Sequence, residues 1–214
     1  APDYVLVDKT VSKKFISCAV QHLKDFFGSD YRNCSDLSRI INEHHTERLA
    51  KLIEKEKGNI LIGGNFEIKE HLFAPTLIAT DLQSPFMKDE IFGPILLIIE
   101  SESLQDSIDI VVDRDKPLAL YVFSQDKKEI AQVVEQTSSG GVCINDTLMQ
   151  AACLNLPFGG VGGSGMSNYH GHYSFECFSH EKGVLHRSEY MDSSLRYPPY
   201  TPQKMKIVKW IMQP

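Results

Sequence analysis

Short apolar runs alternate with stretches whose apolar residues recur at helical spacing over the first two thirds of the chain. The runs have the length of buried strands, and the stretches between them have one apolar face. We predict strands at residues 4–7, 59–62, 76–79, 95–99, 118–123 and 142–145, and helices at residues 11–26, 49–53, 104–111, 130–134 and 204–212. Regular alternation of strand and helix indicates right-handed crossovers and a mostly parallel sheet. The pattern therefore predicts a doubly wound α/β fold.

The pattern changes at about residue 147. Residues 147–171 are rich in glycine and are predicted to form a loop region, whereas residues 172–187 alternate as an extended strand would. An isolated long strand needs a hydrogen-bonding neighbour, so we expect it to pair at a sheet edge or with a partner subunit. The predicted organisation is a partial α/β domain over residues 1–146, the loop region, and an oligomerisation strand with a C-terminal tail over residues 172–214.

Composition narrows the class of protein. The 214 residues are 42% hydrophobic and 23% charged, as is ordinary for a globular protein. A formal net charge of −6 argues against a nucleic-acid partner. No apolar run reaches the roughly 18 residues that a membrane-spanning helix needs. The five cysteines are odd in number and irregularly spaced, which favours reduced thiols in a reducing compartment over a disulfide framework.

The glycine-rich loop contains a G-x-G-x-x-G pattern at Gly160, Gly162 and Gly165. That pattern binds a dinucleotide only between a strand and a helix N-terminus, where backbone amides meet the pyrophosphate. Here Pro157 and Phe158 precede it, and no helical spacing follows. We interpret it as a tight active-site loop in which the backbone passes close to a ligand.

Three histidines and a cysteine near the C-terminal end invite a metal-site hypothesis: His170, His172, Cys177 and His180. On a strand the first two histidines would share a face and the cysteine would not, and no C-x-x-C motif accompanies them. We therefore expect no metal site. Elsewhere, Cys143 lies in an apolar strand and is interpreted as a small buried hydrophobe, whereas the role of Cys153, before Phe158, stays open.

Glu90 and Phe92 come directly before a Gly-Pro turn and the apolar run Ile95–Ile99. By residue type alone, Glu90 is an ordinary solvated acid. Its place beside an aromatic ring at the start of a buried strand favours a binding role. Such a carboxylate accepts hydrogen bonds from a ribose diol while the ring packs on a flat cofactor.

The sequence resembles the C-terminal part of class 3 aldehyde dehydrogenases, the group that includes fatty-aldehyde enzymes. Motifs in matching order carry the resemblance from end to end of the chain. They are residues 1–4, 39–42, 74–76, 90–94, 116–121, 137–141, 157–162, 169–171, 178–180 and 196–199.

The resemblance implies oxidation of an aldehyde to a carboxylic acid with NAD or NADP. In that family a cysteine thiolate attacks the aldehyde, hydride passes to the nicotinamide, and water hydrolyses the resulting thioester. The nucleophile resembles a position two residues before Ala1. The general-base glutamate and the dinucleotide-binding domain are likewise expected upstream, so we expect no catalytic residue in this chain.

Carried over from the family, the site residues are as follows. Glu90 would hold the nicotinamide ribose and Phe92 would pack near the nicotinamide. Phe158 would line the aldehyde entrance with Ala151 and Ala152, and His170 would lie near that opening. The run at residues 150–153 is smaller than is usual in the family, which leaves the chain-length preference for the aldehyde open.

The segment Tyr173–Val184 resembles the dimer-forming strand of the family, which implies a homodimer. The chain stops at Pro214 without the hydrophobic anchor of microsomal relatives, so we expect a cytoplasmic location, with peripheral membrane attachment as the weaker alternative. Two other functions stay open: a catalytically inactive fragment that acts as a dimerising or regulatory module, and a metal-binding protein.

Overall fold

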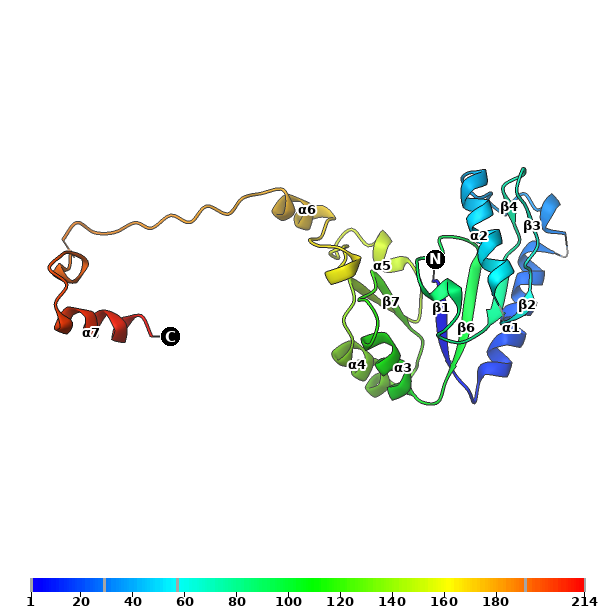
Figure 1. Cartoon of the computed structure of the whole chain (residues 1–214), viewed down its shortest axis with the longest axis horizontal. Helices are drawn as coiled ribbons and strands as arrows, with labels where there is room; N and C mark the ends of the chain where they lie inside the picture. Colours follow the sequence, from blue (N-terminus) through cyan, green and yellow to red (C-terminus); the bar gives the residue numbers. More distant parts are fainter. Residues whose placement is uncertain (1, 29, 57, 191, 214) are drawn as a thin grey trace. The chain divides into compact units, whose positions relative to one another are not determined.

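The computed structural model describes residues 2–28, 30–56, 58–190 and 192–213. The chain divides into two compact units, Ala1–Cys177 and Phe178–Pro214 (Figure 1). The first unit contains every strand and most helices of the described residues, and the second contains two short helical elements. The sequence-based boundaries at residues 146 and 171 stay predictions.

The elements follow one another as strand and helix through most of the first unit. The first half comprises β1 (Tyr4–Asp8), α1 (Ser12–Phe27), η1 (Tyr31–Asn33), α2 (Glu43–Lys55), β2 (Asn59–Ile62), β3 (Phe66–Glu67), β4 (Leu72–Phe73), β5 (Thr76–Ala79) and η2 (Pro85–Met87). The second half comprises β6 (Ile95–Ser101), α3 (Leu104–Val112), β7 (Ala119–Val122), α4 (Lys127–Gln136), β8 (Gly141–Ile144), α5 (Met149–Ala152), η3 (Gly162–Ser164) and α6 (Gly171–Cys177).

The strands form one central sheet and two smaller pairs. The central sheet has the order β1-β6-β5-β2, in which β6 pairs in parallel with both β1 and β5, and β2 pairs antiparallel with β5. Strands β7 and β8 form a separate parallel pair, and β3 with β4 forms a short antiparallel one. The prediction of a mostly parallel α/β fold is confirmed.

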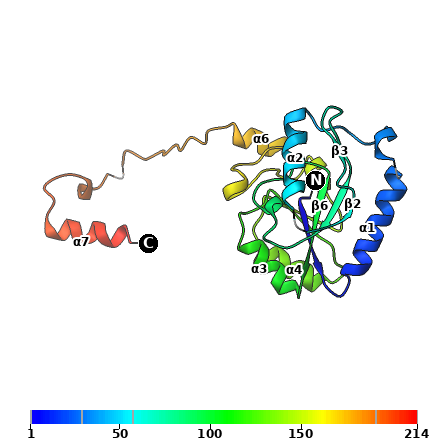
Figure 2. The same ribbon diagram turned by 45° about the vertical axis from the view of Figure 1, so that its right-hand side comes forward.

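Helices cover both faces of the central sheet. One face packs against α1 through Phe15, Val20 and Leu23, and the other packs against α2 through Leu49. Figure 2 shows α1 and α2 on either side of β2 and β6. Burial on both faces explains why β6 is a continuous apolar run: its Leu97 and Ile98 face opposite layers and are each at most 1% exposed.

The pair β7–β8 has its own small core with α3 and α4. Ile108, Val122 and Val133 are its buried members, one from each of α3, β7 and α4. Ser103 caps α3 by accepting a hydrogen bond from the Asp106 amide at 3.1 Å.

The prediction of an extended strand over residues 172–187 requires correction. Gly171–Cys177 forms the helix α6, and the described residues from 178 to 188 belong to no helix or strand. Within α6, His172 and Glu176 lie one helical turn apart and form an ion pair at 2.9 Å between Nε2 and Oε1. A strand needs a neighbour for its backbone groups, and in the described part of this single chain none adjoins the segment.

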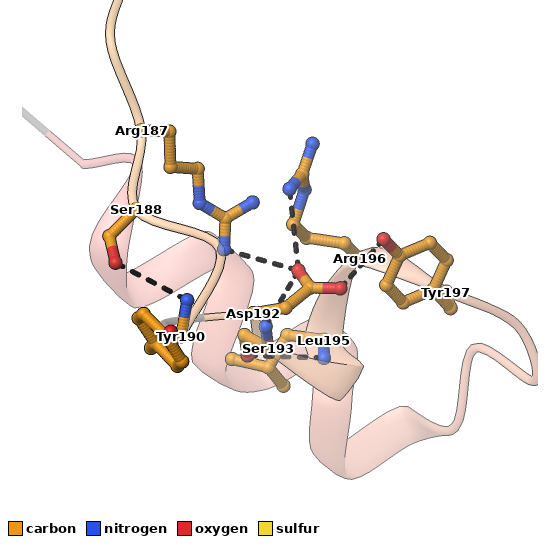
Figure 3. A network of polar contacts seen from close by, with 8 residues as sticks. All are labelled: Arg187, Ser188, Tyr190, Asp192, Ser193, Leu195, Arg196 and Tyr197. Atoms are coloured by element: carbon orange, nitrogen blue, oxygen red, sulfur yellow. Dashed lines mark hydrogen bonds and ion pairs between the residues drawn. The ribbon is translucent and has the colours of Figure 1, made fainter.

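The second unit contains η4 (Ser194–Arg196) and α7 (Pro202–Ile211), and none of its described residues is buried. The helix α7 confirms the helix predicted over residues 204–212. Asp192 organises the segment before it: its carboxylate accepts hydrogen bonds from Arg187 at 3.1 Å and from the Tyr197 hydroxyl at 2.8 Å (Figure 3). Of the helices that the structure describes, none combines the length and apolar character needed to cross a bilayer.

Candidate functional site

The segment Met87–Phe92 connects η2 to β6 and carries the two residues singled out as cofactor ligands. Ile91 is fully buried in the core, whereas Glu90 is exposed and Phe92 is 80% exposed. Phe92 has a φ of 46°, in the left-handed region that residues with a side chain rarely adopt. The buried Ile91 thus anchors the segment, and the residues on either side of it project their side chains outward.

Two charged side chains hold the backbone of Ile91. Its N–H donates to Asp3 Oδ1 at 3.2 Å, and its carbonyl oxygen accepts from Arg48 Nη2 at 2.5 Å. Asp3 lies directly before β1, and Arg48 lies in α2 next to the buried Leu49. The backbone N–H and the carbonyl oxygen of Ile91 are therefore both held by side chains from distant parts of the sequence.

A third charged side chain holds the other end of the segment. The Arg114 guanidinium donates to the Met87 carbonyl oxygen, and its central carbon lies 5.9 Å from the centroid of the Tyr4 ring. That distance is within the range of a cation–π contact. Arg114 follows α3, so a loop on the β7–β8 side of the unit contacts both β1 and the segment before β6.

Burial raises the pKa of the Asp3 carboxyl above its usual value near 3.8. The hydrogen bond from the Ile91 N–H opposes this shift, and the negative charge of the nearby Glu90 adds to it. Asp3 and Glu90 are thus electrostatically coupled across Ile91.

Phe158, Tyr169 and His170 form a compact aromatic cluster on the glycine-rich loop. Phe158 and Tyr169 exchange two backbone hydrogen bonds of 3.0 and 2.9 Å as an isolated antiparallel bridge. The Phe158 ring stacks on His170 with centroids 5.7 Å apart and meets Tyr169 edge-on at 5.5 Å. The predicted entrance residues Phe158 and His170 are therefore in contact.

The other two predicted entrance residues lie on α5. Ala151 is half-buried and Ala152 is exposed. The preceding Leu148 adopts a left-handed φ of 65°, which turns the chain into this short helix. Within the described structure, the buried side-chain atoms Gln150 Oε1 and His170 Nδ1 have no hydrogen-bond partner.

The loop at residues 114–116 adjoins both candidate regions. Arg114 reaches the Met87 carbonyl, while Lys116 and Asp115 lie against the glycine-rich loop. A β-carbon placed on Gly162 would lie 3.5 Å from Lys116 Cδ, and one on Gly163 would lie 3.6 Å from Asp115 Cβ. One short loop thus connects the segment bearing Glu90 to the loop bearing Phe158.

The alternative sites receive little support from the geometry. The described residues contain no group of three or more His, Cys, Asp and Glu side chains arranged to hold a metal ion. In the glycine-rich loop, η3 (Gly162–Ser164) is a single 3-10 turn, so the pattern there does not open an α-helix as a dinucleotide motif would. Cys143 and Cys153 are half-buried free thiols.

Sequence reasoning did not find Asp3, Arg48 and Arg114 as part of the site. One signal was available for Arg48, because a charged residue next to the apolar helix face at Leu49 needs a partner when it is half-buried. Nothing in the local sequence signals Asp3 or Arg114, whose partners are backbone atoms about 88 and 27 positions away.

Comparison with known proteins assigns both candidate regions, with most of the chain, to one protein family. A model described as "Aldehyde dehydrogenase family" matches residues 1–184. The "Aldehyde dehydrogenase, dimeric NADP-preferring" of Mus musculus is 44% identical over 208 residues, covering 96% of this chain and 45% of the mouse protein. "Aldehyde dehydrogenase family 3 member H1" of Arabidopsis thaliana is 42% identical over 212 residues, covering 98% of this chain and 44% of the plant protein.

Solved structures give the same assignment. The substrate-bound state of Staphylococcus aureus AldH superposes with a TM-score of 0.83 at 41% identity, covering all of this chain and 46% of the bacterial one. The chain therefore spans somewhat less than half the length of the relatives that it matches.

Proposed function

This chain belongs to the aldehyde dehydrogenase family. We propose that it forms the part of an NAD(P)-dependent aldehyde dehydrogenase that binds the nicotinamide ribose and lines the aldehyde entrance. The nucleophilic cysteine and the general-base glutamate lie in the remaining part of that enzyme. The reaction is the oxidation of an aldehyde to a carboxylic acid through a cysteine thioester.

The exposed pair Glu90 and Phe92 carries this proposal. A carboxylate that accepts hydrogen bonds from two adjacent hydroxyls needs both oxygens available, and Glu90 is exposed. A ring that packs on a planar cofactor needs a free face, and Phe92 is 80% exposed. The backbone between them is fixed through Ile91, so the two side chains fit a rigid ligand with a ribose beside a flat ring.

When bound, NAD or NADP supplies the acceptor for the hydride. This chain's residues then act by orientation: Glu90 fixes the ribose, and Phe92 limits where the ring can lie. The mouse relative is named as preferring NADP, which supports use of NADP, but the adenosine side that selects between the two is contacted by no residue that we assign here.

The aldehyde side of the proposal rests on the aromatic cluster. Phe158, stacked on His170, offers an apolar wall, and the small side chains of Ala151 and Ala152 leave room opposite a hydrophobic substrate. We assign these four residues to the entrance for an aliphatic or aromatic aldehyde.

We also propose that the protein is a homodimer in which the segment Tyr173–Val184 contributes to the interface. In that segment Phe178 and Val184 are 88% and 75% exposed, and burying such large apolar side chains between two subunits would favour association. The mouse relative is named as dimeric. Sedimentation of the protein as a monomer at micromolar concentration would contradict this proposal.

The experiment that tests the function is Glu90→Gln in the complete enzyme that contains this chain. Glutamine keeps the size of the side chain but loses the charge that strengthens hydrogen bonds to the ribose. We expect kcat for aldehyde-dependent NAD(P)H formation to fall about tenfold, which corresponds to the loss of one charged hydrogen bond. Stopped-flow measurement of NAD(P)H absorbance gives the rate of hydride transfer directly.

Glu100→Gln is the matched control, because Glu100 is an exposed carboxylate on β6 that the site does not use. It is expected to leave kcat and the cofactor KM unchanged. Equal kinetics for Glu90→Gln and wild type would refute the assigned role. If the complete protein oxidised no aldehyde yet still dimerised, the alternative of an inactive dimerising module would be favoured.

A further inference from the structure

We propose that Asp3, Arg48 and Arg114 form a peptide clamp that positions Glu90 and Phe92 for the reaction. This inference rests on the proposed function and adds three positioning residues to it. None of the three is assigned to touch cofactor or aldehyde. Each acts through the backbone of the segment Met87–Phe92.

The clamp contacts three backbone atoms of one short segment. Asp3 accepts from the Ile91 N–H at 3.2 Å, Arg48 donates to the Ile91 carbonyl oxygen at 2.5 Å, and Arg114 donates to the Met87 carbonyl oxygen. These residues come from the position directly before β1, from α2 and from the loop after α3. Three separate parts of the chain thus determine the path of a segment that itself belongs to no strand or α-helix between Lys88 and Pro94.

The segment needs such support because of its conformation. Phe92 has a φ of 46°, which costs free energy unless surrounding contacts hold it. Hydrogen bonds on both sides of Ile91 oppose rotation of the peptides that flank it. Without these hydrogen bonds, the backbone could rotate to relieve the strain at Phe92. That rotation would turn the Phe92 side chain away and move Glu90 with it.

Glu90 directly precedes Ile91 in the chain and is exposed. Hydrogen bonds that fix the backbone of Ile91 therefore fix the point from which the Glu90 side chain extends into solvent.

Arg114 has an additional connection that the other two residues lack. Its neighbours Asp115 and Lys116 lie against Gly163 and Gly162 of the loop that carries Phe158. A change at Arg114 is therefore transmitted toward the aldehyde entrance as well as toward the cofactor segment. In the hydrogen bonds of the described residues, Arg48 and Asp3 contact the segment Met87–Phe92 and not the loop that carries Phe158.

The test compares Arg48→Met and Arg114→Met with wild type in the complete enzyme. Methionine keeps an unbranched side chain but donates no hydrogen bond. We expect hydride transfer in single turnovers to slow about tenfold in each variant, and the primary deuterium isotope effect on kcat to increase because hydride transfer becomes rate-limiting. Arg114→Met should also raise the aldehyde KM, whereas Arg48→Met should not.

Hydrogen–deuterium exchange provides a readout that does not depend on activity. Peptides covering residues 87–92 are expected to exchange about tenfold faster in both variants, while peptides from β6 keep their wild-type rates. A merely structural role would accelerate both regions together. For Asp3 the pair Asp3→Ala and Asp3→Asn is used, because asparagine retains an acceptor for the Ile91 N–H and should preserve more of the wild-type protection.

Arg39→Met is the matched control, because Arg39 also donates to backbone carbonyls, those of Leu37 and Arg32, but away from this segment. If either methionine variant fails to fold, Arg48→Lys and Arg114→Lys retain a charged donor without the planar guanidinium and are measured by the same exchange experiment. Lysine variants are expected to lie between wild type and methionine.

Unchanged exchange at residues 87–92, or a uniform rise across the core, would overturn the clamp. Unchanged hydride transfer in folded Arg48→Met and Arg114→Met would overturn it as well. If Glu90→Gln slows hydride transfer while the clamp variants do not, the proposed function stands and the clamp falls. If the complete protein oxidises no aldehyde, the proposed function falls, and the exchange experiment still decides whether the segment is clamped.

Discussion

The two units of this chain hold their polar contacts in different settings. In Ala1–Cys177, Asp3 is half-buried and fixes a backbone group beside the fully buried Ile91. In Phe178–Pro214, Asp192 is exposed and collects Arg187, Arg196 and Tyr197 at the surface (Figure 3). Exposed ion pairs contribute little to stability, whereas a packed core fixes positions to a fraction of an ångström. The difference explains why the first unit is the better setting for holding the candidate binding residues in fixed positions.

Truncation of a core side chain gives the largest expected effect in this comparison. Ile78 in β5 is 0% exposed, so Ile78→Ala removes fully buried carbon atoms and leaves a cavity. We expect the free energy of unfolding of the first unit to fall by about 4 kcal/mol. Urea unfolding followed by far-ultraviolet circular dichroism measures it.

Ile211→Ala is the matched change in the second unit, where Ile211 is 61% exposed. It should change the free energy of unfolding by less than about 0.5 kcal/mol. Fluorescence of Trp210, the single tryptophan of the chain, reports on that unit. Equal destabilisation by the two substitutions would show that the second unit has a core of its own and would remove the contrast.

A glycine substitution gives the next largest effect, because backbone contact leaves no room for a side chain in the first unit. A β-carbon on Gly140 would lie 2.1 Å from the Gly159 carbonyl oxygen and 2.7 Å from that of Leu118. Gly140→Ala therefore forces β8 and the glycine-rich loop apart, and we expect a loss of about 2–3 kcal/mol in the free energy of unfolding. Thermal unfolding with a fitted enthalpy measures the change.

Gly183→Ala tests the same substitution where the space is open, since no heavy atom of the described residues beyond its chain neighbours lies within 4 Å of a β-carbon placed there. Its expected effect is within about 0.5 kcal/mol of zero. A Gly140→Ala variant as stable as wild type would mean that the approach of the loop to β8 is loose, and the placement of Phe158 would then lose its structural basis.

The alternating pattern of the first unit was sufficient to predict its fold. Runs such as Ile95–Ile99 are apolar on both sides because α1 and α2 cover opposite faces of the sheet. Burial on both faces can therefore be predicted directly from the continuous apolar run. The positions of Glu90 and Phe92 before such a strand followed from the same reasoning together with the family resemblance. Their roles stay predictions.

Two features of the structure could not be predicted from the local sequence pattern. Alternation over residues 172–187 suggested a strand, but a strand depends on a neighbour that the sequence cannot reveal, and Gly171–Cys177 is helical here. The clamp residues were missed for a related reason. Their partners are backbone atoms, which every residue possesses, so the pairing of Asp3 with Ile91 depends only on the three-dimensional path of the chain.

The smallest expected effect is a contrast in pH dependence between Asp3 and Asp192. Burial raises the pKa of Asp3 above 3.8, so the folded state binds this proton more tightly than the unfolded state does. Its contribution to stability is therefore fully present below 3.8 and is lost as the pH rises through the raised pKa. Asp192 has a lowered pKa, chiefly because the Tyr197 hydroxyl donates to it, so its contribution is present above 3.8 and is lost as the pH falls through the lowered pKa.

The two carboxyl groups should accordingly titrate on opposite sides of 3.8, as measured by carbon-13 NMR of the side-chain carboxyls and assigned with Asp3→Asn and Asp192→Asn. Tyr197→Phe removes the main cause of the shift at Asp192 and should return its midpoint toward 3.8 without moving that of Asp3. If Asp192 titrated unchanged in Tyr197→Phe, the network around it would not be formed in solution. If Asp3 titrated at or below 3.8, burial would not be the dominant influence on its carboxyl, and the contrast between a buried and a surface setting would fail.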